Sequence, residues 1–162
     1  MGQRPIDAEL RTIILDLRVP KRAGCVCLPT SPERSRLMAR VRQKRTGPEL
    51  LVRKATHRMG LRYRLNRTDL PGSPDLVFPK YRIALFVHGC FWHQHRGCSR
   101  CTMPKSNEAY WRQKFAENRA RDTRAIRKLR RLGWKCCVVW ECEAMNATLL
   151  ADRLKQFFGE AL

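Results

Sequence analysis

Three of the chain's four histidines and two of its eight cysteines fall in one short stretch, HGCFWHQHRGC, at positions 88–98. Thiolate and imidazole groups are ligands that zinc prefers, and imidazole also carries protons in catalysis. Two large aromatic side chains, Phe91 and Trp92, stand among them. This stretch can therefore act as a metal site, as a catalytic centre or as a wedge that enters another molecule. Each use needs different side chains.

A zinc site is the first of these predictions. Cys90, His95 and Cys98 provide three ligands in a compact loop, and a structural zinc needs a fourth. Spacing favours Cys101, because Cys98 and Cys101 form a Cys-x2-Cys unit. Cys142, which follows a predicted strand, is the competitor. The alternative to a zinc site is a set of buried thiols beside a surface histidine.

A catalytic magnesium site is the second prediction. Asp75 opens the predicted strand DLVF, and His88 ends the next one. This arrangement suits Mg²⁺, which takes few protein oxygens and keeps several waters. The metal would activate a water molecule and stabilise the leaving oxygen, while His88 or His93 moves protons. The competing explanations are a simple turn residue for Asp75 and a satisfied polar group for His88.

The pair Pro74-Asp75 resembles the start of the restriction-endonuclease metal motif. That motif continues with an acid and a lysine, two residues apart, on the next strand. Here the next strand ends Phe86-Val87-His88, and the next acid along the chain is Glu108. If the fold is of this kind, we expect a rebuilt metal site with one strand carboxylate, a backbone oxygen and histidine.

The aromatic residues Phe91, Trp92 and Trp111 allow two interpretations. Burial in the core is the ordinary fate of large aromatic side chains. On a loop fixed by zinc in a basic protein, they can also stack between bases, and such insertion costs least where pairing is already faulty. The sequence leaves both open.

The charge balance predicts a polyanionic partner. The 162 residues include 34 Lys and Arg against 14 Asp and Glu, which gives a formal net charge of +20 and a pI of about 10.7. A folded domain this basic most often binds nucleic acid, and abundant arginine suits contacts with phosphates and bases. The ordinary alternative is a well-solvated protein that happens to carry many basic residues.

Neither a membrane span nor export is indicated. The longest strongly apolar stretch, at 83–87, is far too short to cross a bilayer, and charged residues interrupt the N-terminal segment. We therefore expect the cysteines to be metal ligands or buried thiols rather than disulfides. Cys136 and Cys137, in the middle of a predicted strand, are interpreted as core thiols.

The hydrophobic pattern predicts one α/β domain with a central mixed sheet, which starts near residue 31. Residues 1–30 are interpreted as an appendage with a short amphipathic helix at 7–18. The expected elements of the body are a helix from Pro48 to Gly60, a half-buried strand at 61–65, a turn at 70–74, buried strands at 75–78 and 82–87, a basic helix at 107–131, a buried strand at 134–140 and a helix from about 148 to Gly159. The apolar face of the first helix is predicted at Leu51, Ala55 and Met59, and that of the last at Leu150, Leu154 and Phe157.

Several motifs together resemble the very-short-patch mismatch repair endonucleases (Vsr). These motifs are SRLMARVRQKRTGPELLVRKATHRMGLRYR, LPGSPDLVF, FVHGCFWHQHRGC, PKSN, YW and VVWEC, in that order along the chain. The resemblance implies a Vsr-like endonuclease domain over 31–162 with a restriction-endonuclease-like fold, a central mixed sheet flanked by helices and a structural zinc site. It also implies a Mg²⁺-dependent enzyme that nicks one strand 5′ of the T in a T:G mismatch left by deamination of 5-methylcytosine.

The resemblance also implies roles for individual residues. Asp75 and the backbone carbonyl of Val87 would hold Mg²⁺, His88 and His93 would be the active-site histidines, and Glu49 would act through water. Asp122 would orient the first histidine. The zinc ligands would be Cys90, His95, Cys98 and Cys142, which favours Cys142 over the spacing-based Cys101. The DNA contacts would come from Met38, Phe91, Trp92, Trp111 and Asn118.

The chain departs from the family in three places. Val87 stands where the best-known members have threonine, Cys101 is an additional thiol beside the zinc loop, and residues 1–30 have no recognised counterpart. The expected partners are double-stranded DNA with a T:G mismatch and mismatch-repair coupling proteins, for a monomer in the bacterial cytoplasm, at the nucleoid. The alternatives are a non-catalytic, zinc-stabilised DNA-binding module and a nuclease of the same fold with another substrate.

Overall fold

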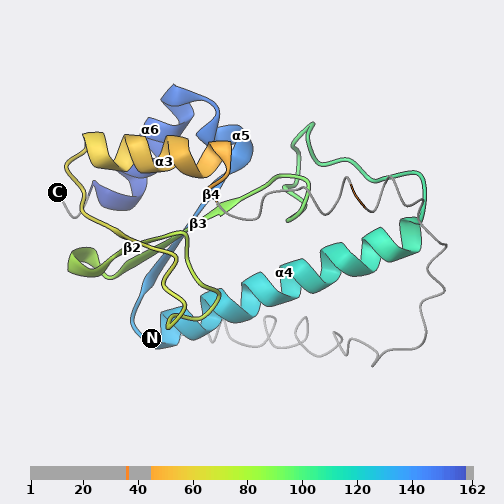
Figure 1. The fold of residues 1–162 in the computed structure, drawn as a ribbon, viewed down its shortest axis with the longest axis horizontal. Helices are drawn as coiled ribbons and strands as arrows, with labels where there is room; N and C mark the ends of the chain where they lie inside the picture. Colours follow the sequence, from red (N-terminus) through yellow and green to blue (C-terminus); the bar gives the residue numbers. More distant parts are fainter. Residues whose placement is uncertain (1–35, 37–44, 160–162) are drawn as a thin grey trace, which may run out of the picture.

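The computed structural model describes residues 36 and 45–159 (Figure 1). The predicted N-terminal helix at 7–18 and Met38 lie outside the described residues. The elements are α3 (Gly47–Arg58), β1 (Arg64–Leu65), β2 (Leu76–Phe78), the short 3-10 helix η1 (Pro79–Tyr81), β3 (Ile83–His88), α4 (Glu108–Arg131), β4 (Lys135–Trp140), α5 (Glu141–Ala144) and α6 (Ala147–Phe158).

The four strands form one mixed sheet in the order β1-β2-β3-β4. Strand β2 runs antiparallel to both β1 and β3, while β3 and β4 run parallel, with His88 opposite Trp140. A parallel pair needs a long crossover, and α4 supplies it. This arrangement confirms the predicted mixed sheet, and it brings the loop after β3 and the start of α5 to the same end of the sheet.

Helices cover both faces of the sheet. Helices α3 and α6 lie on one side and the long α4 on the other (Figure 1). Successive residues of β3 point to opposite faces, so Leu85 packs in the larger core with Val52 and Leu154, whereas Phe86 packs with Leu129 of α4. Because helices cover both faces of the sheet at β3, this strand has an unbroken apolar sequence from Ile83 to Val87. In the part of the chain that the structure describes, no helix is both long and apolar enough to cross a membrane.

The two predicted helix faces are confirmed in part: Ala55 and Met59 of α3 pack against the core and Leu150 and Leu154 of α6 are buried, but one position in each helix is wrong. In α3, Leu51 is 37% exposed, while Val52 and Thr56 face the sheet, and the Thr56 hydroxyl donates to the Val52 carbonyl. In α6, Phe158 is fully buried and Phe157 only partly so. The reason is the same in both helices: which of two adjacent apolar residues faces the sheet depends on how the helix is docked, and local spacing does not determine docking.

Two strand predictions also need correction. The strand expected at 61–65 is only Arg64–Leu65, and both residues are exposed because β1 is the outer strand of the sheet. The strand at 134–140 is buried on one face only: Cys137 and Val139 are buried, while Cys136 is partly buried on the α4 side.

Candidate active site and metal centre

A cleft of about 670 Å³ opens at the end of the sheet where β2 begins and β3 finishes. It brings together the predicted catalytic residues Glu49, Asp75, Val87, His88, His93 and Asp122. They come from five different parts of the fold: the start of α3, the entry to β2, the end of β3, the loop after it and the middle of α4.

Asp75 is held by the neighbouring strand. Its Oδ2 accepts a hydrogen bond from the Val87 amide at 2.8 Å, just before β2 pairs with β3. Burial raises the pKa of Asp75 to about 6; the Val87 hydrogen bond opposes this shift and the Glu49 carboxylate adds to it. Burial makes the ionised form of this carboxylate unfavourable, and a bound cation would stabilise that form. The buried position and the oxygen donor chemistry of Asp75 therefore suit magnesium, which takes few protein oxygens.

Glu49 is buried at the start of α3, where it receives three hydrogen bonds. Its carboxylate accepts from the Arg45 amide at 2.9 Å, the Thr46 hydroxyl at 3.1 Å and the Arg53 guanidinium at 3.2 Å. Helix N-termini favour acidic residues, so Glu49 has a structural reason to be there as well as a place in the cleft. Its action through water stays a prediction.

The two histidines of the cleft stack on each other. The rings of His88 and His93 lie 3.9 Å apart, only 8° from parallel. Burial, together with the neighbouring His93, lowers the pKa of His88 to about 4, so its imidazole is neutral at neutral pH. His93 Nδ1 lies 2.5 Å from Asp122 Oδ2.

The partner of Asp122 differs from the expectation. Asp122 was predicted to orient the first histidine, His88, but its hydrogen bond goes to His93. The reason is geometric: Asp122 projects from α4 toward the loop after β3, where His93 lies, while His88 is buried at the strand end beside Phe86 and Trp140. His88, His93 and Asp122 also lie close enough to hold a metal. Magnesium prefers oxygen ligands, however, and a stacked imidazole pair suits proton transfer better.

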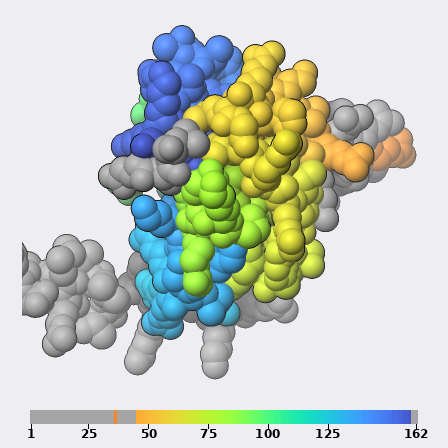
Figure 2. All heavy atoms as spheres, turned by 90° about the vertical axis from the view of Figure 1, so that its left-hand side faces the viewer, coloured from red at the N-terminus to blue at the C-terminus, as the bar shows by residue number. Residues whose placement is uncertain are grey.

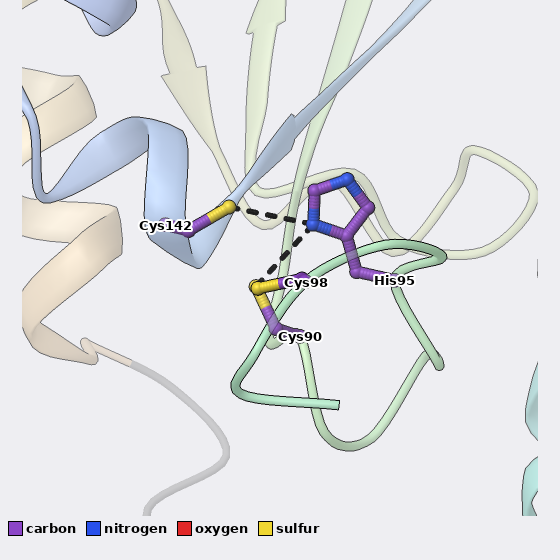
Figure 3. A group of neighbouring side chains, drawn as sticks. All are labelled: Cys90, His95, Cys98 and Cys142. Carbon is purple, nitrogen blue, oxygen red and sulfur yellow. Dashed lines mark hydrogen bonds between the residues drawn. The ribbon is translucent and has the colours of Figure 1, made fainter. Parts of the chain in front are cut away.

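Four side chains converge beside this cleft at a candidate zinc centre (Figure 3). Cys90, His95 and Cys98 come from the loop after β3 and Cys142 from α5, and their ligand atoms all lie within 4.8 Å of one another. His95 Nδ1 is 3.3 Å from Cys142 Sγ and 3.6 Å from Cys90 Sγ. Neighbouring ligands on a zinc tetrahedron are about 3.5–3.8 Å apart, given the usual bond lengths. The donor set and its spacing therefore fit zinc, with Cys142 rather than Cys101 in the fourth place.

Glu141 is a residue that the sequence reasoning missed. One of its carboxylate oxygens accepts from the Cys90 amide at 3.2 Å, and the other accepts from Arg100 at 2.9 Å. It also lines the cleft. Residues 90–100, which carry three of the four candidate zinc ligands, are called the zinc loop here. Glu141 thus joins both ends of this loop, Cys90 and Arg100, to the end of β4. The available signal was an acid directly after the strand that ends in Trp140.

The predicted wedge aromatics form one cluster on α4. Phe91 contacts Trp92, Trp111 and Phe115 edge-on, with ring centroids 5.1–5.4 Å apart. Trp111 is buried, while Phe91 and Trp92 are half-buried. The Asn118 amide, also buried, donates to the Trp92 carbonyl at 3.0 Å and so fixes the loop from α4. Insertion of these residues into DNA stays a prediction.

Basic side chains complete the cleft. Lys114 and Arg121 line it from α4, on either side of Asn118 along the helix. Their separation of seven residues places all three on one helical face. Sequence reasoning recognised the charge of this helix but not the face that these two residues share.

Comparison with known proteins places the chain in a family. The family model for the DNA mismatch endonuclease Vsr matches residues 28–100. A type II nicking enzyme of Xanthomonas oryzae, V.XorIIP, is 52% identical over 126 residues, covering 77% of this chain and 92% of that protein. A type II nicking enzyme of Neisseria meningitidis, V.NmeAIP, is 40% identical over 131 residues, and the match covers 81% of this chain and 93% of that protein.

Two further matches bear on the family and the fold. The DNA mismatch endonuclease Vsr of Escherichia coli is 35% identical over 129 residues, covering 76% of this chain and 82% of that protein. The solved structure of the catalytic domain of the homing endonuclease I-Bth0305I superposes on this chain with a TM-score of 0.50 at 15% sequence identity. The match covers 71% of this chain and 96% of that domain, and it supports an endonuclease-like fold. Given these identities and coverages, the chain belongs to the Vsr family of DNA mismatch endonucleases.

Proposed function

We propose that this protein is a Mg²⁺-dependent endonuclease that nicks one DNA strand 5′ of the T in a T:G mismatch and so initiates repair of deaminated 5-methylcytosine. The observation that carries the proposal is the cleft itself. It joins a carboxylate suited to magnesium, Asp75, with an imidazole that a second carboxylate orients, His93 with Asp122, in a chain of the mismatch endonuclease family.

His93 is the proposed general base. Because Nδ1 is engaged by Asp122, Nε2 is the nitrogen that takes the proton from the attacking water, and the Asp122 carboxylate stabilises the imidazolium that forms. Water then adds to phosphorus, and the bond from phosphorus to the 3′ oxygen breaks. Mg²⁺, held by Asp75 and the Val87 carbonyl, would stabilise the charge on the phosphate and on the leaving oxygen.

His88 and Glu49 have supporting roles in this proposal. Neutral His88, stacked on His93, donates a hydrogen bond to the phosphate or to the leaving 3′ oxygen, and that oxygen takes up its proton from solvent water. Glu49 would act through a water beside the metal. The burial of both residues at the wall of the cleft supports these assignments.

Zinc at Cys90, His95, Cys98 and Cys142 is proposed to be structural. All four positions are taken by protein ligands, which is typical of a closed structural site. The loop that these ligands fix carries His93 and the aromatic pair Phe91 and Trp92. Zinc would therefore fix the distance between the catalytic base and the aromatic side chains that enter the base stack.

The proposed substrate is double-stranded DNA with a T:G mismatch. Phe91, Trp92 and Trp111, with Met38 from the opposite groove, would stack into the faulty step, and Asn118 would hold the loop against the duplex. Lys114 and Arg121 would contact the phosphates. The protein is proposed to act as a monomer. Residues 31–162 would form the nuclease domain and 1–30 an appendage.

The relatives named above are bacterial, which supports action at the nucleoid in the cytoplasm. Coupling to mismatch-repair proteins stays a prediction.

The experiment is a nicking assay on a duplex with a single T:G mismatch and a label on the T strand. With Mg²⁺, the protein should release one labelled fragment that ends directly 5′ of the T. Asp75→Ala should bind the same duplex without cutting it. Binding without cleavage by the wild-type protein at any Mg²⁺ concentration would instead indicate a non-catalytic DNA-binding module.

A further inference from the structure

The turn before Asp75 rests on α4 at one close contact. In Figure 1 the segment that leads from β1 to β2 comes down onto the C-terminal half of α4, and Figure 2 shows the two side by side from another direction. The contact is between Gly72 and Ala125. A Cβ on Gly72 would lie 2.5 Å from the Ala125 Cβ and 3.4 Å from the Phe86 ring. The backbone at Gly72 therefore lies closer to the Ala125 methyl group than any side chain at position 72 would allow.

This contact lies between two parts of the proposed catalytic machinery. Asp75 follows Gly72 by three residues and enters the sheet through its bond to the Val87 amide. Asp122 precedes Ala125 by three residues, about one helical turn, and holds His93. Gly72 and Ala125 both line the same cleft. The turn and the helix thus connect the metal carboxylate to the orienting carboxylate by a short path.

No hydrogen bond joins the turn to α4 among the described residues: the backbone hydrogen bonds of the turn, from Leu70 to Arg67 and from Ser73 to Leu70, are internal to it. Apart from Gly72, the turn meets α4 through Leu70, which packs in the same apolar cluster as Ile126 and Leu129. Helix α4 meets this side of the sheet through apolar side chains such as Leu129 against Ala84 and Phe86. Packing between long apolar side chains permits small sliding movements, whereas a turn backbone seated directly on the Ala125 Cβ defines a distance.

We propose that Gly72 and Ala125 are positioning residues, which set the distance between Asp75 and the His93–Asp122 pair. This inference rests on the proposed function. A methyl group at position 72 would push the turn away from α4 and move the metal carboxylate relative to the base. Displacements well below 1 Å in such a site already slow the chemical step, and 1 Å can cost about 100-fold. Substrate binding, which depends on the charged and aromatic surface, would change little.

The test is Gly72→Ala, measured as single-turnover nicking of the T:G duplex. Gly72 has φ +78°, so part of any effect comes from backbone strain. Gly60→Ala is the matched control, because Gly60 has φ +73° but nothing within 4 Å of a new Cβ. We expect the nicking rate at saturating protein to fall about tenfold or more for Gly72→Ala. The affinity for uncut duplex and the rate of Gly60→Ala should both stay near wild type.

The double variant Gly72→Ala with Ala125→Gly separates positioning from other causes. It removes the opposing methyl group while it keeps the strained backbone and the new methyl in the cleft. Recovery of most of the lost rate supports positioning. Failure to recover would overturn the inference, since the methyl would then act by blocking DNA or by strain alone.

Equal rates for Gly72→Ala and Gly60→Ala would also overturn the inference, while leaving the proposed function intact. A wild-type protein that nicks no mismatched duplex would remove the proposed function, and with it this inference.

Discussion

His93 Nδ1 lies 2.5 Å from Asp122 Oδ2, and this bond joins the zinc loop to the middle of α4. The same loop is tied to β4 through Glu141 and to α4 through Asn118. The proposed base therefore belongs to a segment that is anchored at two points of α4 and at the end of β4. Its proton-accepting nitrogen is determined by the bond to Asp122, as in other histidines that a carboxylate orients.

Asp122→Asn should reduce the nicking rate by about 100-fold or more, because an amide that donates to Nδ1 holds the wrong imidazole tautomer and does not stabilise the charged form. Affinity for the uncut T:G duplex should not fall. The measurement is single-turnover nicking at saturating protein. Asp152→Asn, at an exposed acid of α6, is the control for loss of one negative charge. Equal rates for the two variants would remove the proposed role of Asp122.

Asp75→Asn should abolish nicking and yet make the folded protein more stable. The folded-state pKa of Asp75, about 6, lies above its ordinary value of 3.8, so the ionised carboxylate opposes folding. This cost is absent below pH 4, grows as the pH rises, and is complete above pH 6, where it amounts to about 3 kcal/mol at most. Asparagine keeps an acceptor for the Val87 amide.

The measurement is urea unfolding of the zinc-loaded protein in magnesium-free buffer. The free energy of unfolding of Asp75→Asn should exceed that of wild type at pH 7, and the difference should close toward pH 4. A variant that is less stable than wild type at pH 7 contradicts the burial of a costly charge at this position.

His88 gives a stability profile with the opposite sign. Its folded-state pKa, about 4, lies below the ordinary 6.5, so its contribution is fully present above pH 6.5 and is lost as the pH falls. Between pH 7 and 5 the loss should be about 2 kcal/mol. Because Asp75 acts in the other direction over part of this range, the clean comparison is made in the Asp75→Asn background. There, with zinc in excess, His88→Gln should flatten the decline in stability. An unchanged slope would mean that His88 is not held neutral.

The fourth zinc ligand can be decided by substitution. Cys142→Ser should lose bound zinc and melt at a lower temperature, because Cys142 Sγ lies 3.3 Å from His95 Nδ1. Cys101→Ser should keep its zinc, since Cys101 is not among the four converging ligands. Zinc content after gel filtration is the measurement. Retention by the first variant and loss by the second would restore the assignment that spacing alone suggested.

The sequence predicted most of the fold because its strongest patterns are local. The apolar run IALFV gave the central strand, and the run of 107–131 gave α4 almost to its ends. The exposed Leu51 and the buried Phe158 were misjudged because the docking of a helix decides between adjacent apolar residues.

The candidate site was predictable where its residues are close in sequence. His88, Cys90, His93 and His95 fall within eight consecutive positions, at the end of β3 and on the loop after it, so their density alone indicated chemistry. Residues that depend on tertiary contacts were not predictable from spacing: Cys142 reaches the zinc loop only through the β3–β4 pairing, and Glu141 does so by the same route. Asp122 was named from the family resemblance, but only the structure shows that its partner is His93.

The cleft is proposed to cut DNA because a T:G mismatch is present. The most direct measurement compares single-turnover nicking of two duplexes that differ only at one base pair, T:G against T:A, with each strand labelled in turn and Mg²⁺ present. The T strand of the T:G duplex should be nicked directly 5′ of the T, while its partner strand and both strands of the T:A duplex stay intact. Equal cutting of the two duplexes would contradict mismatch recognition.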